Sequence, residues 1–86
     1  MITQDKLSLY IKYNGDIDHW ARNSIAKEQL IMSDADWYMI DSLLQDLYLV
    51  KQGMASAEFE KNVNNKLKEN CDPQIIDKLV SLAKKK

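Results

Sequence analysis

Three side chains in this sequence have the chemistry that acid–base or nucleophilic catalysis requires. His19 is the only histidine, and an imidazole exchanges its proton near neutral pH. Cys71 lies just before a predicted helix start, where the free amides of a first turn would lower the pKa of a thiol. Glu28 falls inside an apolar arc, and if its helix continued to Met32 the carboxylate would face the core with a raised pKa. An enzyme would need at least two of these groups in one pocket.

Each of the three also has a plainer structural explanation. Helical spacing places His19 opposite Trp20, on the solvent side of its segment. A single cysteine at a junction between helices is usually a small, packed apolar group. For Glu28 we favour a helix that ends or shifts phase before it. No local motif joins Cys71 to His19, so the sequence predicts a protein without catalytic residues.

The loop at residues 14–18 begins like a calcium site, because oxygen-bearing side chains occupy alternate positions. Counted from the first of them, however, the turn glycine of such a site would fall on His19 and its bidentate glutamate on Ile25. A helix cap from Asp16 explains the same pattern. One cysteine and one histidine are too few for a Cys/His zinc site, so we predict no metal and no other cofactor.

The composition indicates one small globular domain spanning residues 1–86. A hydrophobic share of 45% with 29% charged residues is typical of folded proteins, and 86 residues leave room for one core. One cysteine excludes an intrachain disulfide and suits the reducing cytoplasm. No apolar run is longer than residues 47–50, far below the roughly 18 residues that a membrane span needs. A net charge of −1 argues against general binding to a phosphate backbone.

Turn and cap residues divide the chain into five segments of helical length. The breaks fall at residues 14–16, 33–34, 53–56 and 71–73. The side chains suited to cap the following helices are Asp16, Ser33, Ser56 and Asp72. Gly15 and Gly53 can take the left-handed conformation that closes a preceding helix, and Pro73 suits a first helical position.

Apolar periodicity predicts an all-α fold, a compact single-domain bundle of four to five short helices. The third segment is the expected centre of the core, with the widest apolar face: Trp37, Met39, Ile40, Leu43, Leu44, Leu47, Tyr48 and Val50. The second segment gathers one apolar arc: Ile17, Trp20, Ala21, Ser24, Ile25, Ile31 and Met32. The fourth has only a narrow stripe of Phe59, Val63 and Leu67, which places it at an edge.

Charge is distributed unevenly along the chain. Residues 28–50 contain five acidic residues and no lysine or arginine, whereas residues 51–86 contain eight lysines and five acidic residues. The total charge of −1 therefore hides a strongly acidic segment beside a basic one. An acidic surface of this kind attracts and orients a basic partner.

The outward face of the third segment is the candidate partner-binding site, formed by Asp34, Tyr38, Asp41, Gln45 and Leu49. Its carboxylates would steer a basic protein, and its aromatic and aliphatic side chains would supply buried contact. An ordinary solvated face is the alternative. We expect a non-catalytic protein-binding module, in its sharpest form an inhibitor or immunity-type protein that neutralises a basic enzyme. Asp41→Lys should then slow association and leave thermal stability nearly unchanged.

Two other functions stay open. A helix-turn-helix nucleic-acid binder is built from short helices and tight turns, but its recognition helix would have to be the lysine-bearing fourth or last segment. A small homodimeric regulator would use the apolar stripe of the fourth segment as a dimer seam. The terminal lysines, residues 84–86, are too few to bind nucleic acid or a membrane surface alone.

Overall fold

Helix capping and apolar periodicity set most of the observed boundaries. The computed structural model describes residues 1–84 without the side chain of Lys84, so the expectation for the terminal lysines lies outside it. The described part is all-α, as predicted, and its helices are α1 (Gln4–Lys12), α2 (Ile17–Asn23), α3 (Ala26–Ile31), α4 (Asp34–Lys51), α5 (Ala57–Asn70) and α6 (Pro73–Lys84). The predicted caps from Asp16, Ser33 and Ser56 each accept a backbone N–H of the following first turn.

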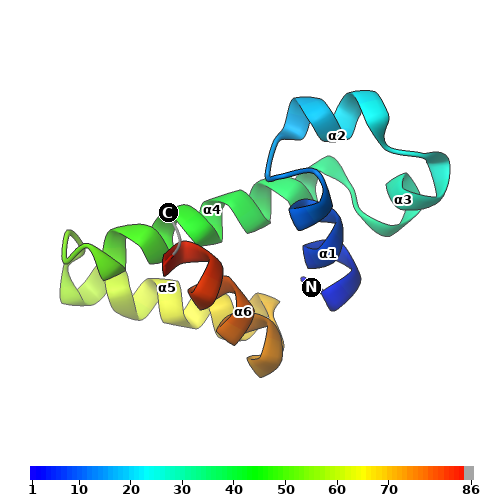
Figure 1. Ribbon diagram of the computed structural model, residues 1–86. Helices are drawn as coiled ribbons and strands as arrows, with labels where there is room; N and C mark the ends of the chain where they lie inside the picture. The colour runs from blue at the N-terminus through cyan, green and yellow to red at the C-terminus, as the bar shows by residue number, and fades with distance from the viewer. Residues whose placement is uncertain (85–86) are drawn as a thin grey trace.

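Helix α4 is the centre of the fold, as its apolar face predicts. Figure 1 shows α4 as the long axis of the molecule, with α5 returning beside it, α6 crossing it and α1 against its N-terminal half. The side chains of α4 that are fully enclosed by these neighbours are Trp37, Ile40, Leu43, Leu44 and Leu47. The apolar face of α4 is therefore the surface on which α1, α5 and α6 pack.

The apolar stripe on α5 packs against the protein's own core. Val63 and Leu67 are buried and Phe59 packs against the same core, because α5 lies along α4. These side chains are not available on the surface as a dimer seam. Beyond α5, the chain passes Cys71, which is buried and forms an isolated parallel bridge with Ile2.

The second predicted segment is wrong as a single helix, because the chain breaks at Ser24 and Ile25. Both residues have extended backbone angles, so α2 ends at Asn23 and α3 begins at Ala26. The phase of the helical pattern is lost at this break, and Ile25 is left 60% exposed instead of joining the apolar arc. Figure 1 shows α2 and α3 as an excursion from the end of α4 where α1 also packs.

A tight reversal at Asn14 and Gly15 joins α1 to this excursion. Both residues are left-handed, with φ of 57° and 67°, and the Gly15 amide donates to the Tyr10 carbonyl at 3.0 Å. A Cβ atom on Gly15 would lie 3.0 Å from the Tyr10 hydroxyl. Glycine is therefore needed here for its backbone angle and for the close approach of a ring.

Gly15→Ala is expected to destabilise the fold more than Gly53→Ala. Both positions have positive φ, so each alanine should cost about 1 kcal/mol of strain, or a melting temperature lower by ~4 to 8 °C. Only Gly15 also meets a side chain, since nothing lies within 4 Å of a Cβ on Gly53. Thermal unfolding of both variants measures the difference. Equal losses would show that the contact with Tyr10 contributes nothing.

Candidate protein-binding face

Four aromatic rings hold α1, α2 and the start of α4 together. Tyr10 lies 4.8 Å from Trp37 and Tyr13 lies 5.5 Å from Trp20, measured between ring centroids. The two tryptophans stack at 5.6 Å with an interplanar angle of 26°. Tyr10 lies in α1 and Tyr13 is the residue that caps its C-terminus, so two rings three residues apart fix this end of the helix.

The Tyr13 hydroxyl leads to Glu28, which is only 7% exposed. Its carboxylate accepts hydrogen bonds from Tyr13 at 2.5 Å and from the Lys12 ammonium at 2.6 Å. It also accepts the free amide of Ile25 at 3.1 Å, and so caps α3 at a position whose own side chain has no acceptor.

These donors stabilise the ionised form of Glu28. Hydrogen bonds from Lys12, from Tyr13 and from the backbone amide lower the pKa of its carboxyl group to about 2, because together they outweigh the effect of burial. The helix does break before Glu28, as the favoured interpretation held, yet the side chain is buried all the same. The raised pKa belonged to the alternative of an unbroken helix, and the sequence alone did not reveal that Lys12 and Tyr13 donate to this carboxylate.

The Tyr10 hydroxyl leads to the second carboxylate, Asp41, on the outward side of α4. Tyr10 is buried and donates to Asp41 Oδ1. Burial and this hydrogen bond raise the pKa of the Tyr10 hydroxyl far above its ordinary value. Asp41 is therefore half-buried instead of fully exposed, and Asp41→Lys would remove an acceptor from a buried hydroxyl. Because of this contact, Asp41→Lys should lower stability and not leave it nearly unchanged.

Ion pairs inside the chain neutralise three of the five acidic residues of the 28–50 segment. Glu28 pairs with Lys12, Asp36 pairs with Lys6 at 3.2 Å, and Asp46 lies 3.9 Å from Lys66. The other two are Asp34 and Asp41, and among the described side chains no lysine, arginine or histidine forms an ion pair with either.

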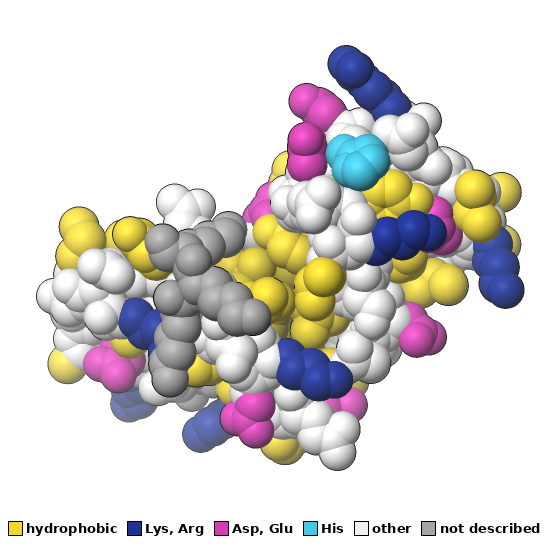
Figure 2. Space-filling view, in the orientation of Figure 1, with side chains coloured by type: hydrophobic (Ala, Val, Ile, Leu, Met, Phe, Trp, Pro, Cys, Tyr) yellow, Lys and Arg dark blue, Asp and Glu magenta, His cyan; other side chains and the backbone are white. Residues whose placement is uncertain are grey.

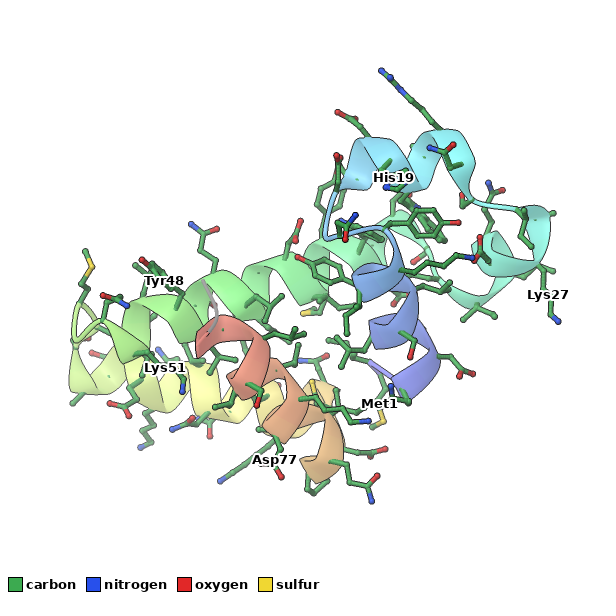
Figure 3. All side chains as sticks on the ribbon, in the orientation of Figure 1. Met1, His19, Lys27, Tyr48, Lys51 and Asp77 are labelled. Atoms are coloured by element: carbon green, nitrogen blue, oxygen red, sulfur yellow. The ribbon has the colours of Figure 1, made fainter. Side chains whose placement is uncertain are left out.

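The predicted binding residues lie along one side of α4. Because α4 is continuous over Asp34–Lys51, residues 34, 38, 41, 45 and 49 fall within about 80° of one another around its axis. Asp34 and Gln45 are exposed, and Tyr38 between them is 58% exposed. Leu49 is half-buried near the far end of the helix, where Figure 3 labels its neighbours Tyr48 and Lys51. We call Asp34, Tyr38, Asp41 and Gln45 the acidic face.

The sequence pattern missed a cavity at the edge of the acidic face. A hollow of about 350 Å³ opens beside Asp41, lined also by Tyr10, Ile11, Asn14, Gly15, Leu44 and Leu82. These residues come from α1, α4, α6 and the reversal after α1. Ile11 is 49% exposed. No local signal reveals the hollow, because its walls are up to 72 positions apart in the chain.

The three candidate catalytic residues do not share a pocket. His19 lies at the surface, as expected (Figure 2), although it is partly buried, with its ring edge-on to Tyr13 at 5.1 Å between ring centroids. Glu28 contacts the same tyrosine, but its oxygens are already occupied by three donors. Cys71 lies beside Ile2, and burial raises the pKa of its thiol, which disfavours the reactive thiolate.

Comparison with known proteins finds no matching family model, no matching curated protein and no matching solved structure. Within residues 1–84, no group of three or more His, Cys, Asp and Glu side chains has the geometry to hold a metal ion. No helix in that same part of the chain combines the length and the hydropathy that crossing a bilayer requires. Function must therefore be argued from the surface itself.

Glu28→Gln is expected to lower stability at neutral pH and to lose that effect in acid. The folded pKa of Glu28 lies below its unfolded value, so the ionised carboxylate stabilises the fold above pH ~4.5. That contribution disappears as the pH falls through about 2. Urea unfolding of both proteins between pH 7 and pH 2 should show the gap in free energy closing within this window. A gap that stays constant with pH would contradict the network.

Proposed function

We propose that this chain is a non-catalytic protein-binding module and that its acidic face docks a basic protein. One observation carries the proposal. Within a segment of five acids, internal lysines hold three, while Asp34 and Asp41 stay unpaired along one side of α4 among the described residues. A carboxylate that no internal cation neutralises keeps its negative charge available to attract an incoming cation.

Tyr38 gives the acidic face the buried contact that charge alone does not supply. It lies between the two unpaired carboxylates, and 58% of its surface is open to solvent. Interfaces draw much of their binding energy from tyrosine, tryptophan and arginine, and aligned carboxylates mainly raise the association rate. An exposed tyrosine flanked by acids therefore suits a basic partner better than a neutral one.

The most specific form of this proposal is an inhibitor or immunity-type protein. An enzyme that acts on nucleic acid carries a cationic cleft, and an acidic protein face can cover that cleft in place of the substrate. The reducing cytoplasm would suit such a protein, since its only cysteine is a buried free thiol.

The lysines of the last two helices lend less support to nucleic-acid binding. Lys66 on α5 is directed to Asp46, and Lys78 on α6 donates to Gln4. A recognition helix needs its cations turned outward together. A gel-shift measurement at low salt would detect this alternative function directly.

Asp34→Lys is expected to slow association with the partner by ~3- to 10-fold at low salt. Proteins retained by the immobilised wild-type chain from an extract of its source cells are compared with those retained by Asp34→Lys. The protein that prefers the wild type is then purified, and its association kinetics are measured against salt concentration. We expect it to be basic, and we expect the effect of the variant to shrink at high salt.

Glu58→Lys provides the matched control. Glu58, like Asp34, is an exposed acid in the first turn of a helix, but α5 begins at the opposite end of α4 (Figure 1). Glu58→Lys therefore changes the net charge as much as Asp34→Lys does, and it likewise places a cation near the N-terminus of a helix. Equal slowing by the two variants, or an acidic partner, or no protein that prefers the wild type, would contradict the proposal.

A further inference from the structure

The hollow beside the acidic face belongs to a longer groove between α1 and α6. A second hollow, of about 460 Å³, is lined by Gln4, Leu7, Ile11, Asp77, Lys78, Ser81 and Leu82. It shares Ile11 and Leu82 with the hollow beside Asp41, so the two hollows adjoin each other at these residues. Figure 2 shows hydrophobic side chains gathered at the surface in this region of the molecule. The groove exists because α1 and α6 both pack on α4 at different places along it.

The Asp41 end of this groove combines an apolar channel with one carboxylate. Ile11 is 49% exposed on one side, Leu82 is half-buried on the other, and Leu44 forms the apolar base. Asp41 Oδ1 accepts the Tyr10 hydroxyl, and among the described residues no side chain donates to Oδ2. The Tyr10 ring lines the same hollow.

These features match the side chain of arginine. Arginine has an aliphatic stem that packs on apolar surface and a planar guanidinium that pairs with carboxylates and stacks on aromatic rings. A volume of about 350 Å³ lies at the small end of the range for ligand pockets, roughly 300 to 1,000 Å³, and admits a single side chain. Lysine would lose the stacking and the planar pairing.

We propose that the hollow beside Asp41 is an anchor pocket for one arginine of the basic partner. The stem of that arginine would lie between Ile11 and Leu82, with its guanidinium on Asp41 Oδ2 and beside the Tyr10 ring. The proposal rests on the proposed function, since it names the contact that holds a basic protein after the acidic face has attracted it. It follows from charge complementarity between an unpaired carboxylate and a cation with an apolar stem.

Short peptides test the pocket without the partner. The probe is the acetylated and amidated peptide Ala-Leu-Arg-Leu-Ala, and its matched versions carry lysine or citrulline in place of arginine. Citrulline keeps the shape of arginine and removes its charge. Chemical shifts of the isotope-labelled chain should move around residues 10–15, 41–44 and 82 on titration with the arginine peptide. We expect binding about tenfold weaker with citrulline.

Asp41→Asn is the decisive variant, because asparagine can still accept the Tyr10 hydroxyl while the negative charge is lost. We expect it to weaken arginine-peptide binding about tenfold with little change in melting temperature. Ile11→Ala should also weaken binding, through the stem of the arginine. Glu58→Gln, an exposed acid in the first turn of α5 and outside both the pocket and the acidic face, is the control and should leave peptide affinity within about twofold.

Three results would overturn the anchor pocket. Equal binding of the arginine and citrulline peptides would remove the role of charge, and an unchanged affinity for Asp41→Asn would remove the role of this carboxylate. Binding that appears only after deletion of residues 84–86 would make the chain's own lysines the occupant. If one of these results is obtained and Asp34→Lys still slows association with the purified partner, the anchor pocket is ruled out but the proposed function is not.

Discussion

Two tyrosine hydroxyls at the end of one helix, each donated to a carboxylate, set the arrangement on which the rest of the structure depends. Tyr10 lies in the last turn of α1 and Tyr13 caps that helix, and each ring packs on one tryptophan of a stacked pair. Their hydroxyls leave the cluster in different directions, one to Asp41 and one to Glu28. An apolar ring cluster thus fixes two charged groups at its border, because a buried hydroxyl requires an acceptor.

This arrangement gives the two carboxylates different roles. Glu28 is buried, pairs with Lys12 and caps α3, so its charge helps to hold the α2–α3 excursion in place. Asp41 accepts the Tyr10 hydroxyl through one oxygen and lines an open hollow. With Asp34, it forms the part of the acidic segment that is available to another molecule. The proposed docking of a basic protein depends on this division.

Local features of the fold could be predicted from sequence, and long-range features could not. The caps at Asp16, Ser33 and Ser56 and the central position of α4 follow from patterns within a few residues. The break before α3 was located only loosely, because its cap is a glutamate held by a tyrosine 15 positions earlier. The contact between Tyr10 and Asp41 spans 31 positions. The proposed binding residues on α4 could be predicted as one helical face, but the hollow beside them could not, because it depends on the positions of Ile11 and Leu82.

The central claim is that a basic protein docks on α4 around Asp34 and Asp41, which no cation of the described residues neutralises. Chemical-shift mapping of the isotope-labelled chain with its purified partner tests this most directly, because each backbone amide reports its own environment. The account predicts the largest shifts along residues 34–45 and at residues 10–15, with α5 nearly unaffected. Shifts concentrated on α5, with the acidic face unchanged, would contradict it.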